Sequence, residues 1–209
     1  RLGLDLLIRS EEEREFQLAN DQYYLVRGKK KSHLQIGLKG KQKPILCNFT
    51  EWASNKKKSN LLRCMKGLPL DCSVVDATAG FGRDALELAT VSNTVVLIER
   101  VPWLHYLLQD GIKNSTEEYV LSLVRKFELI HSDARDFFAF KKNEADVVYL
   151  DPMFPNTGSA RAKKNIQALR DLSEEDLSND LLLMALDFAK KRVIVKRHRN
   201  SGYLNNQNP

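Results

Sequence analysis

Cysteine is scarce in this chain of 209 residues, and the little that is present is scattered. The three cysteines, Cys47, Cys64 and Cys72, form no Cys-x-x-Cys pair. This spacing argues against a disulfide framework and gives no support to a zinc site or a catalytic thiol. We therefore expect free thiols, a reducing compartment and no metal centre.

Long apolar runs are missing as well. No run of apolar residues in the sequence is long enough to cross a bilayer, and no secretory signal pattern opens it. We therefore expect a cytoplasmic protein without a membrane partner.

Charge of both signs is plentiful, and the net formal charge is +6. Clustered positive residues suit the phosphate backbone of a nucleic acid, although a solvated surface explains any single cluster equally well. Because the chain has four clusters, we favour a polyanionic partner. They are Lys29–Lys31, Lys56–Lys58, a group of Arg161, Lys163 and Lys164, and a C-terminal group of Lys190, Lys191, Arg192, Lys196, Arg197 and Arg199.

The chain divides into three regions of different texture. Residues 1–53 contain short alternating segments (LDLLIR, QYYLVRG, HLQIGL and PILCNF) punctuated by glycine and proline, which predict a small β-rich N-terminal element. Residues 54–71 read as a basic linker leading into a helix. Residues 72–209 alternate apolar strands with helices, which predicts an α/β fold with a mostly parallel, Rossmann-like sheet covered by helices on both faces.

A first group of motif residues lies in the stretch VVDATAGFGRDALELA, which reads as strand, glycine turn and helix. Gly80 and Gly82 permit a sharp turn and a close approach of the backbone to a ligand. Glu99 ends the next strand, where an acid can accept both ribose hydroxyl protons. Asp76 ends the first strand, where it could orient a cationic or amino-acid-like part of a ligand. This arrangement is similar to the first motif of class I S-adenosylmethionine methyltransferases.

Other interpretations stay open for these residues and for two further acids. The spacing Gly80-x-Gly82-x-x-Ala85 is a loose match to the dinucleotide fingerprint, so an NAD-linked enzyme competes. Asp133 follows the strand FELIH, where it could meet an adenine amino group or simply cap the short helix after it. Asp84 opens the helix after the glycine turn and could interact with the positive end of that helix.

A second group of motif residues is Asp151-Pro152-Met153-Phe154, directly after the apolar strand ADVVYL. It resembles the [DN]-P-P-[YF] motif of methyltransferases that act on amines and amides. The Asp151 carboxylate and the Pro152 carbonyl can accept the hydrogens of a flat amine, and proline fixes the direction of that carbonyl. Phe154 offers a face on which a base can stack, which is worth about 1–3 kcal/mol in single-stranded systems.

Together, VDATAGFGRDALELA, LIER, LIHSDA, VVYLDPMFP and RVIVKR resemble the small-subunit ribosomal RNA (guanine-N2)-methyltransferase J family. The resemblance implies methyl transfer from S-adenosylmethionine to N2 of one guanine in small-subunit ribosomal RNA, in a bacterial cytoplasm. It also implies, by matched position, that the cofactor is contacted by Arg83 and Asp84, Glu99 and Arg100, Asp133 and Ala134, and Asp151.

Three rival functions remain. The Asp151 motif indicates that an amine is methylated but does not indicate which molecule carries the amine. A DNA base or a protein amide is therefore an alternative substrate. An RNA-binding module with a degenerate cofactor pocket is a second rival, and the NAD-linked enzyme is the third. The sequence leaves open whether naked ribosomal RNA or a ribosomal subunit is the partner.

Overall fold

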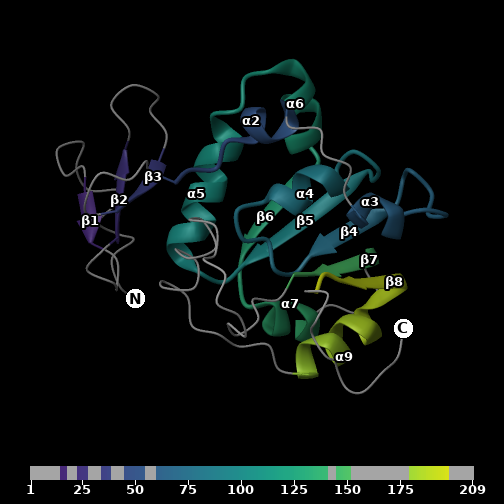
Figure 1. The fold of residues 1–209 in the computed structure, drawn as a ribbon. Coiled ribbons are helices and arrows are strands. Elements are labelled where there is room, and N and C mark those ends of the chain that lie inside the picture. The colour runs from purple at the N-terminus through teal and green to yellow at the C-terminus, as the bar shows by residue number, and fades with distance from the viewer. Residues whose placement is uncertain are drawn as a thin grey trace.

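The chain forms two sheets in the computed structural model, one small and antiparallel, the other larger and parallel. Their strand orders are β1-β2-β3 and β6-β5-β4-β7-β8. Figure 1 shows the small sheet to one side of the molecule, beside α5, and the larger sheet at its centre. The structure describes residues 15–17, 23–27, 34–38, 45–54, 60–140, 145–151 and 179–197.

The larger sheet is parallel between every pair of neighbouring strands. Strand order reverses at the central strand β4, because the next two strands in the chain lie on one side of it and the last two on the other. This is the doubly wound arrangement that the alternating strands and helices predicted. Its strands are β4 (Ser73–Asp76), β5 (Thr94–Glu99), β6 (Phe127–His131), β7 (Ala145–Leu150) and β8 (Ala189–Val195).

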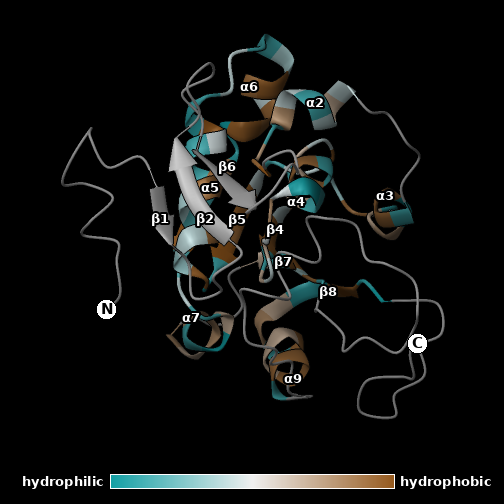
Figure 2. Ribbon diagram, turned by 60° about the vertical axis from the view of Figure 1, so that its left-hand side comes forward, coloured by the Kyte–Doolittle hydropathy of each residue, from teal (hydrophilic) through white to brown (hydrophobic). Residues whose placement is uncertain are grey.

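Helices cover both faces of this sheet, which is why its strands are apolar on both sides. Alternate residues of one strand enter different cores: Val74 packs in the core beneath α4, α5 and α6, and Val75 packs beneath α7 and α9. Figure 2 shows hydrophobic residues along the inner strands of the larger sheet, a hydrophilic part in β8, and several helices with one hydrophilic side. The helices are α4 (Arg83–Leu88), α5 (Pro102–Lys113), α6 (Glu118–Val124), α7 (Ala134–Phe140) and α9 (Asn179–Phe188). No helix within the described ranges has the length and hydropathy that a membrane span requires.

The N-terminal element is confirmed as β-rich. Strands β1 (Glu15–Gln17), β2 (Tyr23–Arg27) and β3 (Leu34–Leu38) pair antiparallel. The predicted segment LDLLIR lies outside the described residues. The small helix α3 (Asn60–Cys64) falls within the segment 54–71.

The segment PILCNF was wrongly predicted to be a strand. Ile45 forms only an isolated bridge, and α2 (Phe49–Ser54) begins at the last residue of the segment. Asn48 explains the switch, because its Oδ1 accepts a hydrogen bond of 3.1 Å from the Glu51 N–H and so caps the helix. Phe49 is buried in the same core as Val74, so this segment packs directly on the larger sheet's domain.

Candidate active site

Polar side chains gather where the carboxyl ends of the parallel strands meet. Asp76 ends β4 and Glu99 ends β5, while Asp151 and Lys196 directly follow β7 and β8. Asp133 follows β6 by two residues. In open α/β sheets, ligands bind at this edge, near the point where strand order reverses. The candidate site therefore lies around the carboxyl end of β4.

The turn after β4 is tied to both neighbouring strands. The Ala77 N–H donates to the Tyr149 carbonyl of β7 at 3.0 Å, and the Ala79 N–H donates to the Ile98 carbonyl of β5 at 3.1 Å. The hydroxyl oxygen of Thr78, between them, accepts a hydrogen bond of 2.6 Å from the Asp151 N–H. The backbone of this turn is thus held in place before any ligand arrives.

The two glycines of the turn have different structural roles, although both have positive φ (55° at Gly80 and 75° at Gly82). A Cβ on Gly82 would lie 2.6 Å from the Leu108 Cδ2 and 3.2 Å from the ring of Phe49, so this glycine permits close packing. Among the described residues, a Cβ on Gly80 would meet only the Thr78 carbonyl oxygen, at 3.8 Å. Gly80 is therefore the glycine that borders open space, where a ligand can approach the backbone.

Asp76 is buried with one oxygen unsatisfied. Its Oδ1 accepts a hydrogen bond of 3.1 Å from the Thr78 N–H, while its Oδ2 has no partner among the described residues. Burial and the nearby Asp84 carboxylate raise the pKa of Asp76 well above its usual range. A buried acceptor of this kind calls for a donor, and preferably a cationic one.

Glu99 is buried at the tip of β5 and accepts two backbone hydrogen bonds. Its Oε2 accepts from the Gly80 N–H at 2.9 Å and its Oε1 from the Val101 N–H at 2.7 Å. Burial raises the pKa of Glu99 to about 7, although these N–H donors favour the ionised form. Each carboxylate oxygen keeps a further lone pair for a ligand hydroxyl. Glu99 thus connects the glycine turn to the position predicted for a ribose.

A polar network joins Asp151 to the first helix after the turn. The Lys196 Nζ lies 2.7 Å from the Asp151 Oδ2 and 2.6 Å from the Asp84 Oδ2. The same Asp84 oxygen accepts a hydrogen bond of 2.6 Å from the Tyr149 hydroxyl. Asp84 therefore belongs to this network, and its role is not limited to an interaction with the positive end of α4.

Burial raises the pKa of the Asp151 carboxyl to about 6. Lys196 opposes this rise and Asp84 adds to it. Burial also disfavours the charge on Lys196, but Asp151 and Asp84 outweigh it and raise the pKa of Lys196 to about 12. At neutral pH the lysine is a cation shared by two carboxylates.

Other predicted site residues take local roles in the described structure. The Asp133 Oδ1 accepts a hydrogen bond of 2.8 Å from the Arg135 N–H, which caps α7 in the way that its alternative interpretation predicted. Ala134 is buried as the first residue of that helix. The Arg83 guanidinium lies 4.6 Å from the centre of the Trp52 ring, and the Arg100 carbonyl lies 3.2 Å from the His131 Nε2. Their contacts with a cofactor remain predictions.

The structure brings Asp76, Gly80, Glu99, Asp84 and Asp151 to one edge. Pro152 and Phe154, predicted to hold the amine and stack the base, lie outside the described residues. No cluster of His, Cys, Asp and Glu within the described ranges could hold a metal ion.

Three residues of this edge were missed as site residues: Thr78, Tyr149 and Lys196. Lys196 was assigned only to the C-terminal basic cluster. Its position directly after an apolar strand, which it shares with Asp151, is the signal that could have placed it here. Tyr149 looked like one more apolar strand residue, and nothing in the sequence pairs its hydroxyl with Asp84.

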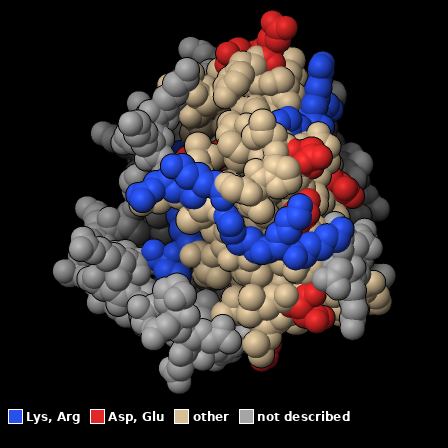
Figure 3. Space-filling model, turned by 90° about the vertical axis from the view of Figure 1, so that its right-hand side faces the viewer, with Lys and Arg blue, Asp and Glu red and all other residues tan. Residues whose placement is uncertain are grey.

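The described part of the C-terminal basic cluster is largely engaged within the chain. Lys191 pairs with Asp146 at 2.9 Å, and Arg192 donates hydrogen bonds to the carbonyls of Cys64 and Lys66. Figure 3 nevertheless shows Lys and Arg side chains forming a belt across the face that lies to the right in Figure 1. At Lys191 and Arg192 the positive charge is thus engaged in contacts within the chain. The other three clusters lie outside the described residues.

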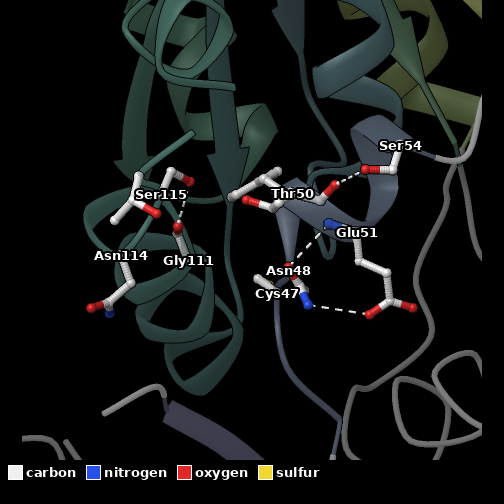
Figure 4. A pocket seen from close by; sticks show the side chains of 10 residues that line it. Cys47, Asn48, Thr50, Glu51, Ser54, Gly111, Asn114 and Ser115 are labelled. Carbon is white, nitrogen blue, oxygen red and sulfur yellow. Dashed lines mark hydrogen bonds between the residues drawn. The ribbon is translucent and has the colours of Figure 1, made fainter. Parts of the chain in front are cut away.

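A hollow of about 420 Å³ lies away from this edge, between α2 and the end of α5. Figure 4 shows Asn48 and Glu51 on one side of it, and Gly111, Asn114 and Ser115 on the other. Asn48 and Glu51 bond to each other, and Ser115 bonds to the Gly111 carbonyl at 2.9 Å. None of the predicted site residues lines this hollow.

Comparison with known proteins places the chain among methyltransferases. A family profile described as "Putative SAM-dependent methyltransferase" matches residues 11–209. Among solved structures, a SAM-dependent methyltransferase from Neisseria gonorrhoeae has a TM-score of 0.68 and 26% identity over 97% of this chain and 79% of that chain.

Curated relatives carry a more specific name. The ribosomal RNA small subunit methyltransferase J of Chromobacterium violaceum is 34% identical over 197 residues, which cover 86% of this chain and 74% of the relative. Its namesakes from Laribacter hongkongensis and Aeromonas salmonicida are 43% and 42% identical over 65% and 66% of this chain. The chain spans about half the length of these two relatives (50% and 57%). It belongs to the SAM-dependent methyltransferase family that includes ribosomal RNA small subunit methyltransferase J.

Proposed function

We propose that the chain transfers a methyl group from S-adenosylmethionine to the exocyclic N2 of a guanine in small-subunit ribosomal RNA. The observation that supports this proposal most directly is the 2.6 Å hydrogen bond between the Asp151 N–H and the Thr78 hydroxyl oxygen. It joins the residue that would hold the amine to the turn that would hold the cofactor. The names of the curated relatives support ribosomal RNA as the substrate.

The described residues fit S-adenosylmethionine. The unsatisfied Oδ2 of Asp76 suits the amino group of an amino-acid moiety, and the open space at Gly80 admits a ligand next to the backbone. Glu99 is placed to accept ribose hydroxyl protons. When bound, this cofactor supplies an electrophilic methyl group. The glycine turn by itself would also suit NAD, but family membership favours S-adenosylmethionine.

The chain's own part in the reaction is to orient the amine. The Asp151 carboxylate accepts one amine hydrogen, and we assign the second to the Pro152 carbonyl and the base face to Phe154. Holding both hydrogens turns the nitrogen lone pair toward the methyl donor, so the rate gain comes mainly from positioning. A strong general base is not required, because the nitrogen becomes acidic once it is alkylated and can lose its extra proton to water.

The basic clusters are the proposed contacts for RNA phosphates, which position the substrate without reading its sequence. The target guanine must leave its stack to reach the site. Ribosomal RNA would be met in the cytoplasm.

We also propose that the chain divides after residues 53 and 71, with the methyltransferase domain over residues 72–209.

The direct test incubates the chain with labelled S-adenosylmethionine and unmodified small-subunit ribosomal RNA, and in parallel with unmodified subunits. We expect label in N2-methylguanosine after digestion to nucleosides. Label found instead at adenine N6, in DNA or on protein glutamine would refute the substrate assignment. If calorimetry detects no S-adenosylmethionine binding, an RNA-binding module with a degenerate pocket replaces the enzyme.

The role of Asp151 has its own test. Asp151→Ala should abolish transfer and weaken S-adenosylmethionine binding only partly, since the turn and Glu99 remain. Asp187→Ala removes an exposed aspartate of α9 and is the matched control. Full activity in Asp151→Ala would refute the role of Asp151 in orienting the amine.

A further inference from the structure

Lys196 occupies an unusual place for a lysine of a basic cluster. Its backbone N–H donates to the Leu150 carbonyl at 2.8 Å, so the β7–β8 ladder continues to the residue before Asp151. The side chain then reaches both Asp151 and Asp84, and half of its surface is exposed. A fixed backbone and two short ion pairs give the ammonium group a defined position.

Acidic side chains from two other elements and one lysine surround Asp151. Asp84 interacts with it from α4 and accepts the hydrogen bond of the Tyr149 hydroxyl, and Asp76 lies close by at the end of β4. Among the described groups that act on Asp151, Lys196 is the cation. Without it, burial and the Asp84 carboxylate would both drive Asp151 to take up a proton.

We propose that Lys196 is a positioning residue for methyl transfer: its ammonium group holds the Oδ2 of Asp151 against Asp84 and keeps the carboxylate available as an acceptor for the substrate amine. The lysine occupies Oδ2, and we assign Oδ1 to the amine. A neutral carboxylic acid is a weaker acceptor and carries a proton that an amine hydrogen would meet. The inference rests on the proposed function for its reaction, but the state of Asp151 can be measured without substrate.

The test compares Lys196→Met, which removes the charge, with Lys196→Arg, which keeps it. Lys113→Met, at an exposed position in the last turn of α5, is the matched control for the loss of one positive charge. The carboxyl carbon of Asp151, assigned in the NMR spectrum with Asp151→Asn, is titrated in each protein. We expect its pKa of about 6 to rise by about one unit in Lys196→Met, at the low end of the usual range because Lys196 is half exposed.

A second variant, in which the Asp151 pKa should change in the opposite direction, keeps the test valid if Lys196→Met does not fold. Asp84→Asn removes the carboxylate that raises the Asp151 pKa and leaves Lys196 to Asp151 alone, so the titration should move to lower pH. Lys196→Arg should restore most of the wild-type titration, and Lys113→Met should overlay it. An Asp151 pKa that is unchanged in both Lys196→Met and Asp84→Asn overturns the inference, whatever the enzyme methylates.

Activity gives the second readout. The acidic limb of the dependence of kcat on pH should follow the Asp151 titration, because transfer needs the ionised carboxylate. In Lys196→Met this limb should move to higher pH, with little change in the KM for S-adenosylmethionine. A loss confined to the KM for RNA would mark Lys196 as a phosphate contact and refute the positioning role. If the wild-type chain methylates no guanine, the proposed function fails, and the NMR titration still decides whether Lys196 controls Asp151.

Discussion

Gly82→Ala should damage folding, whereas Gly80→Ala should damage cofactor binding. Both glycines have positive φ, so each alanine carries the cost of a left-handed backbone, about 1–2 kcal/mol. At position 82 the new methyl group would also lie 2.6 Å from the Leu108 Cδ2 and 3.2 Å from the Phe49 ring, both fully buried. Overpacking of a core costs about 1–3 kcal/mol more. At position 80 the methyl group would make no such close contact with a described residue.

The total for Gly82→Ala is therefore about 2–5 kcal/mol, which lowers the Tm of a chain of this size by roughly 4–20 °C. Gly80→Ala should lower stability by about 1–2 kcal/mol only. Its methyl group stands in the open space beside the turn, so S-adenosylmethionine affinity should fall at least tenfold, or by about 1.4 kcal/mol.

Chemical denaturation measures the first effect and isothermal calorimetry the second. The two variants act as controls for each other, because they share the backbone cost and differ in the space around the methyl group. Equal destabilisation by both, or stronger loss of cofactor affinity in a folded Gly82→Ala than in Gly80→Ala, would refute the division of roles.

Two further predictions concern Glu99 and Tyr149. Cofactor affinity should fall as pH drops through about 7, because protonation of Glu99 removes the charged acceptor for ribose hydroxyls. Calorimetry on either side of that pH checks this, and Glu99→Gln should flatten the dependence; an equally steep dependence in the variant contradicts the assignment. Tyr149→Phe should lose about 1.5 kcal/mol in the free energy of unfolding, because it deletes the hydrogen bond to the Asp84 carboxylate. Denaturation measures this loss, and wild-type stability in the variant would show that the buried hydroxyl contributes nothing.

The inner strands β4, β5 and β7 were predictable because each is a short apolar run that ends in an acidic residue or directly precedes one. That pattern predicts from the sequence that Asp76, Glu99 and Asp151 lie at one edge of the sheet. It holds because both faces of a parallel sheet are covered by helices while its carboxyl edge stays accessible.

The separate roles of Gly80 and Gly82 were not predictable in the same way. They depend on which residues of α2 and α5 pack against the turn, and these are distant in sequence. Lys196 was misread for a related reason: a lysine in a basic cluster looks like a phosphate contact until its carboxylate partners are brought to it. The strand predicted for PILCNF failed because a local cap at Asn48 outweighed the alternating pattern.

Phe49 contacts two glycines at once. A Cβ on Gly82 would lie 3.2 Å from its ring, and so would one on Gly111 in α5. The aromatic ring therefore occupies space that two distant positions of the methyltransferase domain leave for it by having no side chain. A fragment that starts at residue 72, where the alternation of strands and helices begins, would lack Phe49 and leave the space beside the glycine turn unfilled. We therefore expect a stable fragment to include Phe49.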